Sequence, residues 1–399
     1  MPEPMLTLDA ALARLLDAAM PVAGTERLPA QETLGRVLAA PVVAGVDVPP
    51  LDNAAMDGYA LRTADWAEGH RLKVVQRIAA GSVGQALQPG EAARIFTGAP
   101  VPPGADAVVM QEACEALGDE VLVSRPPRPG ENIRRAGEDM AVGQAVLQVG
   151  DRLTPARLGV AASAGVTQLE VYRRLRAAVF FTGDELVRPG QPLAPGRIYN
   201  SNRATLTALL QGLGCEVLDL GDVADDLAAT VATLEAASRQ ADVVITSGGV
   251  SVGEEDHVKA AVERLGRIEL WRVAMKPGKP LVHGRVGVTD FLGLPGNPVS
   301  AFVVFCLFVR PFLLKRMGER ARPPLRLQVP AGFAWPKAGS RREFLRARIE
   351  AGQAVLYPNQ SSGVLSSLAW ADGLVDLDIG VTVEPGQALP FLPLSELMA

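Results

Sequence analysis

The stretch ADVVITSGGVSVGEED, residues 241–256, joins a short apolar run to a glycine-rich turn and a group of acids. An apolar run of four to eight residues that ends at a turn signal is typical of a fully buried strand. Similar runs end in glycine turns at residues 175–183 and 290–296, and helical patterns separate them. Because strands alternate with helices, we expect a parallel sheet with helices on both faces. The sequence therefore predicts a doubly wound α/β domain over residues 176–322.

On either side of this domain the hydrophobic pattern has period two, which indicates short strands. Residues 72–153 hold several such runs, and residues 325–399 return to the same pattern. Helices are predicted over residues 6–20, 30–39 and 154–165. The predicted fold class is a multidomain α/β and β protein, with β-rich domains flanking the central α/β domain. We expect four domains: an elongated N-terminal α+β domain at 1–49 plus 137–175, an inserted β-rich domain at 50–136, the α/β domain at 176–322 and a C-terminal β-rich domain at 323–399.

Composition and charge favour a cytoplasmic protein. The formal net charge of −5 offers no overall attraction to nucleic acid or to an anionic membrane, so neither partner is expected. The three cysteines are widely spaced and form no C-x-x-C pair, which indicates free thiols in a reducing compartment. No basic segment leads into an apolar one at the N-terminus, so no signal peptide is predicted. The apolar residues 299–314 contain Arg310 and Pro311, and we expect them to form a buried helix too short to span a bilayer.

Residues 249–253 match the G-x-S-x-G pattern of the α/β-hydrolase nucleophile. In that fold the serine stands on the turn directly after the strand, whereas Ser251 comes well into the loop. The chain has only three histidines, and none has the sequence context of a catalytic base. Because a five-letter pattern is weak evidence, we expect that Ser251 is not a nucleophile.

A geometric interpretation of the same loop is stronger. Ligands of doubly wound sheets bind at the carboxyl ends of the strands, and helix N-termini there favour anions. The chain has no G-x-x-x-x-G-K-[ST] and no G-x-G-x-x-G pattern, which argues against a P-loop and against an ordinary dinucleotide fold. We therefore predict an anion site on this rim, with loop residues Thr182, Gly183, Ser247, Gly248, Gly249, Ser251, Gly296 and Asn297.

Charged residues crowd the same rim. The acids are Asp184, Glu185, Asp225, Asp226, Glu254, Glu255 and Asp256. Helix N-capping explains Asp226 and Glu254 at least as well as ligand binding does, but several acids beside a phosphate site also suit Mg²⁺. Lys276 and Lys279 stand on a proline-bearing turn. Lysines are usually solvated, yet this placement favours contact with an oxyanion. A further cluster is upstream, at Asp57, Thr97, Arg134, Arg135 and Asp139, and its spacing alone indicates no particular ligand.

Seven strings occur along the chain in a characteristic order: DNAAMDGYA (52–60), TGAPVPPGADAVVMQE (97–112), NIRRAGED (132–139), FTGDEL (181–186), SGGVSVGEED (247–256), KPGKP (276–280) and LPGNPVSA (294–301). Together they resemble the molybdopterin molybdenumtransferase family, which includes the E domain of gephyrin. The resemblance is specific because it rests on all seven strings. It implies that molybdate is inserted into adenylated molybdopterin with release of AMP, and that a divalent metal such as Mg²⁺ takes part.

The resemblance also implies roles for individual residues. Catalytic positions would be Asp57, Thr97, Asp139, Glu185, Asp225 and Asp256, with Asp225 and Asp256 orienting the metal. Lys276 and Lys279 would hold the oxyanion, while Pro295, Pro298 and Ser300 belong to a loop at the substrate. Two C-terminal strings, SRREF (340–344) and NQSSG (359–363), match more loosely and offer Arg341, Arg346 and Ser362 as substrate-binding residues.

The upstream acids and the rim loops lie on different predicted domains. A second subunit would bring Asp57, Thr97 and Asp139 to the rim most simply, and the resemblance implies such a homodimer with a shared site. Transient contact with the molybdopterin adenylyltransferase that makes the substrate is expected. That enzyme shares the α/β domain but has no need of residues 1–175 or 325–399, so it is a poorer match to this chain. Two alternatives stay open from sequence alone. One is a paralogue that has lost catalysis, and the other is a preference for tungstate over molybdate.

Overall fold

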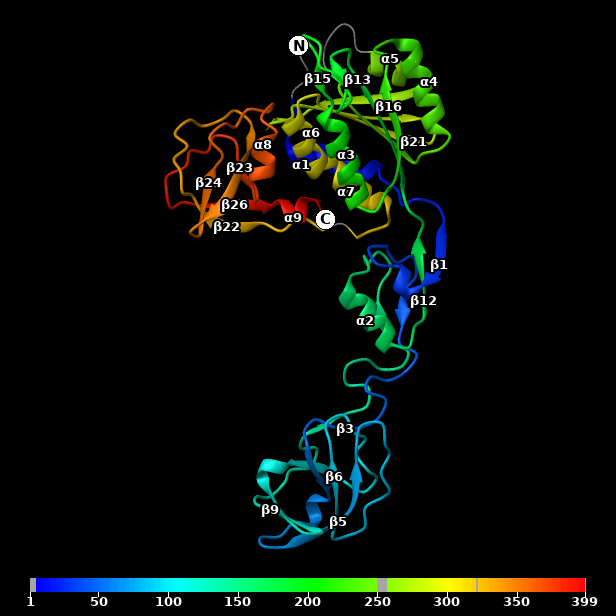
Figure 1. The fold of residues 1–399 in the computed structure, drawn as a ribbon, viewed down its shortest axis with the longest axis vertical. Coiled ribbons are helices and arrows are strands. Elements are labelled where there is room, and N and C mark those ends of the chain that lie inside the picture. Colours follow the sequence, from blue (N-terminus) through cyan, green and yellow to red (C-terminus); the bar gives the residue numbers. More distant parts are fainter. Residues whose placement is uncertain (1–4, 250–256, 321, 399) are drawn as a thin grey trace. The chain divides into compact units, whose positions relative to one another are not determined.

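The computed structural model describes residues 5–249, 257–320 and 322–398. The chain folds into two compact units (Figure 1). Unit 1 comprises residues 1–26, 35–39 and 171–399, and unit 2 comprises residues 27–34 and 40–170. This division is coarser than the four predicted domains. The α/β segment and the C-terminal segment share unit 1, and residues 40–49 and 137–170 of the predicted N-terminal domain fall in unit 2 with the inserted domain.

Unit 2 is built around a six-stranded sheet with the strand order β7-β4-β6-β5-β9-β8. Only the pair β5–β6 is parallel, and the others are antiparallel. Alternate side chains enter two cores: Ala60 and Val108 lie on one face, and Leu61 and Val109 on the other. The strands are β4 (Gly58–Leu61), β5 (Arg71–Ile78), β6 (Glu91–Ile95), β7 (Ala107–Met110), β8 (Cys114–Leu117) and β9 (Glu120–Val123).

Shorter elements complete unit 2 and its connections. Strand β2 (Val42–Val43) pairs with β11 (Ala145–Leu147), β3 (Asn53–Ala54) with β10 (Ile133–Arg134), and β1 (Thr25–Pro29) with β12 (Gln168–Tyr172). Helix α2 (Pro155–Ser163) begins at the cap Thr154, as predicted. The helix predicted over residues 30–39 is wrong. Only the turn η1 (Ala30–Glu32) is helical there, because Gly35 has a φ of +75°, which a right-handed helix excludes. Two further 3₁₀ turns are η2 (Thr63–Asp65) and η3 (Gln111–Ala113).

The α/β segment of unit 1 contains a six-stranded sheet with the order β16-β13-β17-β21-β20-β18. The pairs among the first four strands are parallel, whereas β20 pairs antiparallel with both β21 and β18. The prediction of a parallel sheet is therefore wrong at this edge, since β20 and β21 form a hairpin through a short turn at Gly287. The strands are β13 (Arg176–Thr182), β16 (Glu216–Val223), β17 (Val243–Ser247), β18 (Gly266–Arg272), β20 (Pro280–Val286) and β21 (Thr289–Leu294).

Helices cover both faces of this sheet. Val179 and Phe181 of β13 pack in the larger core with α3, while Phe180 packs in the opposite core with α4 and α5. This alternation is why β13 is apolar at almost every position. The helices are α3 (Ser201–Gly212), α4 (Leu227–Ser238) and α5 (His257–Leu265), and a small parallel pair, β14 (Leu186–Val187) and β15 (Ile198–Tyr199), stands between β13 and α3.

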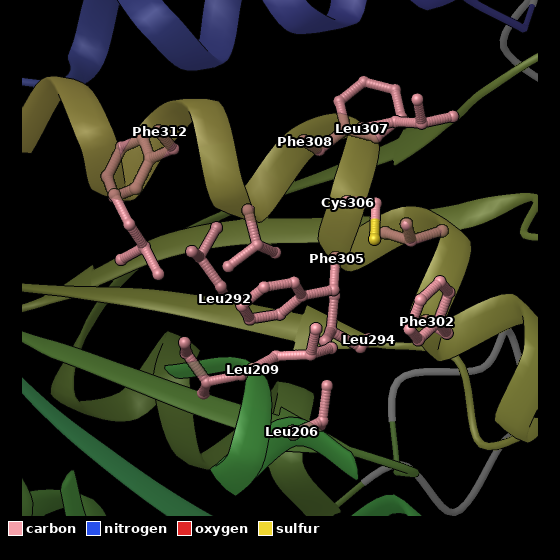
Figure 2. Packing of buried hydrophobic residues seen from close by; sticks show 14 of the residues in the cluster. Leu206, Leu209, Leu292, Leu294, Phe302, Phe305, Cys306, Leu307, Phe308 and Phe312 are labelled. Carbon is pink, nitrogen blue, oxygen red and sulfur yellow. The ribbon is translucent and has the colours of Figure 1, made fainter. Parts of the chain in front are cut away.

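One continuous helical segment fills the larger core. It runs through α6 (Pro298–Val304), a π-helical turn η4 (Phe305–Val309) and α7 (Arg310–Arg316). Figure 2 shows Phe305 of this segment close to Leu292 and Leu294 of β21 and to Leu209 of α3. Pro311 does not end the helix, because it stands in the first turn of α7 directly after the π-turn, a position where a missing N–H is tolerated.

The same segment is long and apolar enough to cross a membrane, so the expectation that it is too short is wrong. However, 72% of its most apolar window is buried inside the protein. The segment is therefore a core element, and the prediction of a buried helix is confirmed.

The N-terminal helix α1 (Leu8–Ala18) belongs to unit 1 rather than to the upstream β-rich part. Leu8, Ala11 and Leu15 enter the larger core. At its C-terminal end, Lys315 Nζ donates to Leu16 O at 2.7 Å. A cation at this end also offsets the partial negative charge of the helix carbonyls.

The C-terminal segment of unit 1 forms a second six-stranded sheet with the order β19-β23-β25-β26-β22, and β24 pairs with β23. The parallel pair β19–β23 joins Met275 and Lys276 to Arg342 and Glu343, so the α/β segment contributes one strand to this sheet. The elements are β19 (Met275–Lys276), β22 (Leu327–Pro330), β23 (Arg342–Glu350), β24 (Gln353–Leu356), α8 (Ser366–Trp370), β25 (Gly373–Leu377), β26 (Ala388–Pro393) and α9 (Leu394–Met398).

Candidate active site

The loops that follow β13, β17 and β21 lie on one rim of the α/β sheet. Parallel register places Phe181 beside Ser247 and Ser247 beside Leu294. The three strands therefore end together, as the sequence predicts. Glycine-bearing turns at Gly183, Gly248 and Gly296 begin where these strands stop.

A pocket of about 640 Å³ opens at this rim, and we call it the lysine pocket. It lies between the α/β segment and the C-terminal segment. Its lining includes ten residues of the predicted site, and Pro277, Gly278, Pro280, Gln360 and Ser361 in addition. The predicted ten are Gly248, Gly249, Lys276, Lys279, Pro295, Gly296, Asn297, Ser300, Arg341 and Ser362.

A second pocket of about 630 Å³ adjoins the first, and we call it the tyrosine pocket. The two share Gly248, Gly296 and Asn297 as a common wall. The tyrosine pocket also contains the predicted residues Thr182, Glu185, Ser247 and Pro298, together with Leu186, Ile198, Tyr199, Asn200, Ser201, Asn202, Gly363 and Leu365.

The shared wall is held by Asn202, the second residue of α3. Its Nδ2 donates to Ser247 Oγ at 2.6 Å and to Gly296 O at 2.7 Å. Ser247 Oγ in turn donates to Pro295 O at 3.3 Å. One side chain thus ties the end of β17 to the loop after β21. The sequence prediction did not include Asn202, because an Asn at a helix start is usually a cap.

Two glycines of the lysine pocket permit its close backbone packing. Gly278 has a φ of +96°, and a Cβ there would lie 2.5 Å from Val304 Cγ2. Gly248 has a φ of +94°, and a Cβ there would lie 3.0 Å from Thr182 O. Any other residue would push α6 or β13 away from the pocket wall.

The cations of the lysine pocket differ in their surroundings. Lys276 Nζ donates to Glu343 Oε1 at 2.9 Å, and its side chain is 48% exposed. Arg341 donates from Nη1 to Met275 O at 3.3 Å, so one face of its guanidinium is engaged with backbone. Lys279 is exposed and forms no ion pair with the described residues.

Arg346 does not line either pocket. It is 1% exposed and donates to Ser367 Oγ at 3.1 Å and to Ser361 O at 3.2 Å. Burial lowers the pKa of its guanidinium to about 10. Arg346 thus supports the loop that carries Ser361 and Ser362, and it shares its strand face with the buried Phe344.

Two carboxylates lie beside the end of β13. Asp225 Oδ1 accepts a hydrogen bond from Thr182 Oγ1 at 3.1 Å. The Glu185 carboxyl lies against Gly183, where a Cβ would meet Oε2 at 2.7 Å. Asp226, in contrast, caps α4 by accepting from Ala229 N at 2.9 Å, which is the capping role considered for it. Ser251 and Asp256 lie outside the described residues, as do Glu254 and Glu255.

In unit 2, Asp57 and Thr97 are in direct contact. Asp57 Oδ1 accepts from Thr97 N at 2.8 Å and from Thr97 Oγ1 at 2.7 Å. Asp139 is exposed, and its backbone N–H donates to Val48 O at 3.0 Å. Arg135 Nη1 pairs with Asp52 Oδ2 at 2.5 Å, so this arginine has an acid partner of its own.

Three family models match consecutive parts of the chain. The MoeA N-terminal region (domain I and II) matches residues 6–165, the probable molybdopterin binding domain matches residues 178–315, and the MoeA C-terminal region (domain IV) matches residues 328–394. A molybdopterin molybdenumtransferase of Haemophilus influenzae is 44% identical over 345 residues, which are 86% of this chain and 85% of that protein. The chain belongs to the molybdopterin molybdenumtransferase family. As a member, it is a transferase of molybdenum cofactor biosynthesis.

Other members of the family match over similar lengths. Molybdopterin molybdenumtransferase 2 of Mycobacterium tuberculosis H37Rv is 41% identical over 382 residues, covering 92% of this chain and 93% of that protein. The crystal structure of the molybdopterin biosynthesis MoeA protein from Pyrococcus horikoshii OT3 has a TM-score of 0.85 at 29% identity, and covers 98% of this chain and 100% of that chain. The family resemblance that the sequence motifs carry is therefore confirmed, and the multidomain α/β and β fold with it.

Proposed function

We propose that this transferase inserts molybdate into adenylated molybdopterin and releases AMP. The observation that carries the proposal is the pair of adjoining pockets. One is lined by cations and the other by aromatic, apolar and hydroxyl groups, and both share Gly248, Gly296 and Asn297. Such a pair can hold an oxyanion beside an organic substrate.

The lysine pocket is the proposed oxyanion site. Molybdate carries two negative charges, which Lys279, Arg341 and Lys276 can offset. Charge-assisted hydrogen bonds to an oxyanion are stronger than neutral ones. Ser300, which is buried, and Ser362 add hydroxyl donors along the same wall.

The tyrosine pocket is the proposed site for the adenylated pterin. Tyr199 is 43% exposed and Ile198 is 55% exposed, so flat apolar surface is available for ring stacking. Ser201 supplies a hydroxyl that would orient a phosphate or a ring nitrogen. Asn200 and Ser247 are buried and hydrogen-bonded within the protein, so they shape the wall rather than contact the ligand. The lining of this pocket is mixed, with polar residues beside Leu186, Ile198 and Tyr199, which suits a ligand that combines a ring system with a phosphate.

The donors beside β13 fit a hard divalent cation such as Mg²⁺. Asp225 keeps Oδ2 free of hydrogen bonds to the described residues, and Glu185 lies close by at Gly183. The described residues contain no group of three or more metal-ligating side chains. That arrangement suits Mg²⁺, which takes one or two carboxylates and completes its shell with water and substrate oxygens. We assign Asp225, with Asp256, to the metal, which would supply charge neutralisation at the phosphates.

Several further features belong to the same proposal. The strand order β16-β13-β17 supports a ligand site between β13 and β17, since doubly wound sheets bind ligands where the strand order reverses. The active unit is a homodimer in which Asp57, Thr97 and Asp139 of a second copy complete each site.

A transient contact with molybdopterin adenylyltransferase would deliver the substrate. The free thiols of Cys114 and Cys306 support a cytoplasmic location.

The test is AMP release by the purified protein supplied with adenylated molybdopterin, molybdate and Mg²⁺. We expect AMP to appear only when molybdate is present. The control for any variant of the two pocket lysines is the variant with Lys73 and Lys337 changed to Ala. These two lysines are exposed and lie away from both pockets, so this variant should be fully active. No AMP from the intact protein would favour the alternative, a paralogue that keeps the fold without catalysis.

A further inference from the structure

Glu343 is a buried acid in contact with a cation of the lysine pocket. Its side chain is 9% exposed, and its Oε1 accepts from Lys276 Nζ at 2.9 Å. The two residues face each other in the parallel pair β19–β23. Gly339 lies directly behind the carboxyl, since a Cβ there would be 3.2 Å from Glu343 Cδ. The carboxylate is therefore confined between a backbone turn and the ammonium.

This contact leaves Lys276 able to bind a second anion. An ammonium has three N–H donors, and the Glu343 contact uses one of them. Because the Lys276 side chain is half-exposed in the lysine pocket, the others can reach a ligand. Lys276 would not leave Glu343 altogether, since that would strand an uncompensated charge in a buried position.

We propose that Glu343 is a positioning residue that holds Lys276 at the pocket wall and limits the affinity of the pocket for doubly charged oxyanions. The inference rests on the proposed function, in which the lysine pocket takes the oxyanion. Glu343 repels a bound dianion across the ammonium, so the oxyanion is held firmly enough to be oriented but loosely enough to move toward the adjoining pocket. Lys279, which has no such acid beside it among the described residues, supplies undiminished attraction.

The charge of the ligand separates this role from a purely structural one. Molybdate and perrhenate are both tetrahedral oxyanions of similar size, with charges of −2 and −1. Removing one fixed negative charge changes the binding free energy of the dianion twice as much as that of the monoanion. At a separation of about 6 Å in a water-like dielectric, the affinity should rise about tenfold for molybdate and about threefold for perrhenate.

The experiment is calorimetric titration of the full-length protein with molybdate and with perrhenate. Glu343→Gln should tighten the binding of both ions, about tenfold for molybdate and about threefold for perrhenate. Glu350→Gln removes the same charge from the other end of β23, where the acid is 43% exposed and pairs with Arg348, and it should change neither affinity. Equal changes for the two ions, or no change, in a folded Glu343→Gln protein would overturn the proposal.

A second comparison removes both charges of the pair, so it works even if the Glu343→Gln single variant does not fold. Lys276→Gln alone leaves the Glu343 charge unopposed, so it should bind molybdate least well. Adding Glu343→Gln should recover part of that loss, whereas equal affinities of the single and double variants would contradict the proposal. If wild type and the Lys276→Ala, Lys279→Ala variant bind molybdate equally, the oxyanion assignment itself fails instead.

Discussion

The Asp57 carboxylate accepts two hydrogen bonds from a single residue, Thr97, one from its backbone N–H and one from its hydroxyl. These two bonds hold the pKa of Asp57 below its ordinary value, and the backbone bond contributes more than the hydroxyl bond. Asp57 therefore stays ionised at every pH at which the enzyme is expected to work. Any contribution of this contact to the free energy of unfolding is fully present at pH values above the ordinary pKa of an aspartate. It is lost as the pH falls through the lowered pKa of Asp57.

Thr97→Val removes the hydroxyl bond and leaves the backbone bond in place. We expect the pKa of Asp57 to rise toward its ordinary value, which carboxyl NMR titration can follow. Thr97→Ser keeps both donors and should titrate like the wild type. An Asp57 pKa that is the same in the valine and serine variants would show that the hydroxyl contact does not form.

Loss of both pocket lysines should weaken binding of the oxyanion. In the variant Lys276→Ala, Lys279→Ala we expect the molybdate concentration for half-maximal AMP release to rise about a hundredfold or more, because two charge-assisted contacts are lost and each contributes roughly 1.5–3 kcal/mol. The dependence on adenylated molybdopterin should change much less. An unchanged molybdate dependence would remove both lysines from the oxyanion site.

Gly278 offers a test of the pocket wall with an internal control. Gly278→Ala places a methyl group 2.5 Å from Val304 Cγ2, while Gly287, at φ +61°, has open space around its Cβ position. Gly287→Ala should cost about 1 kcal/mol of unfolding free energy from backbone conformation alone. Gly278→Ala should cost about 1–3 kcal/mol more through the clash and should weaken molybdate binding. Equal losses in urea denaturation would mean that the wall at Gly278 packs less tightly than this distance requires.

The proposal of a site shared between two subunits predicts complementation between inactive chains. Asp57→Ala and Asp225→Ala chains are each expected to be inactive alone. After subunit exchange, half of the dimers are mixed, and each mixed dimer has one intact site of two. Activity should therefore return to roughly a quarter of the wild-type value. If exchange is demonstrated by labelled subunits and no activity returns, each site is built within one chain.

Much of the α/β fold follows from local sequence. The apolar runs of β13, β17 and β21 and the glycine turns after them predict the rim correctly, and the long apolar pattern predicts the α6–α7 segment. The antiparallel edge was missed although a signal was present. Gly287 stands between two apolar runs, which favours a hairpin rather than a crossover.

Motifs bring several pocket residues together from distant segments, including Arg341 and Ser362, but they do not reveal the supporting contacts between those segments. Lys276 was expected in the pocket, but Glu343 is 67 positions away and reaches it only through the β19–β23 register. Arg346 was expected to face the substrate, and strand parity instead places it beside the buried Phe344. Asn202 was overlooked because an Asn at a helix start is usually a cap, and its two acceptors come from distant segments, the end of β17 and the loop after β21.

The molybdenum inserted per AMP released tests the central claim most directly. The purified enzyme would receive adenylated molybdopterin and molybdate, with AMP measured by chromatography and pterin-bound molybdenum by mass spectrometry of the separated product. We predict one molybdenum inserted for each AMP released, and loss of both products together in the Asp225→Ala protein. AMP release that proceeds equally without molybdate, or molybdenum insertion without AMP, would contradict the proposed reaction.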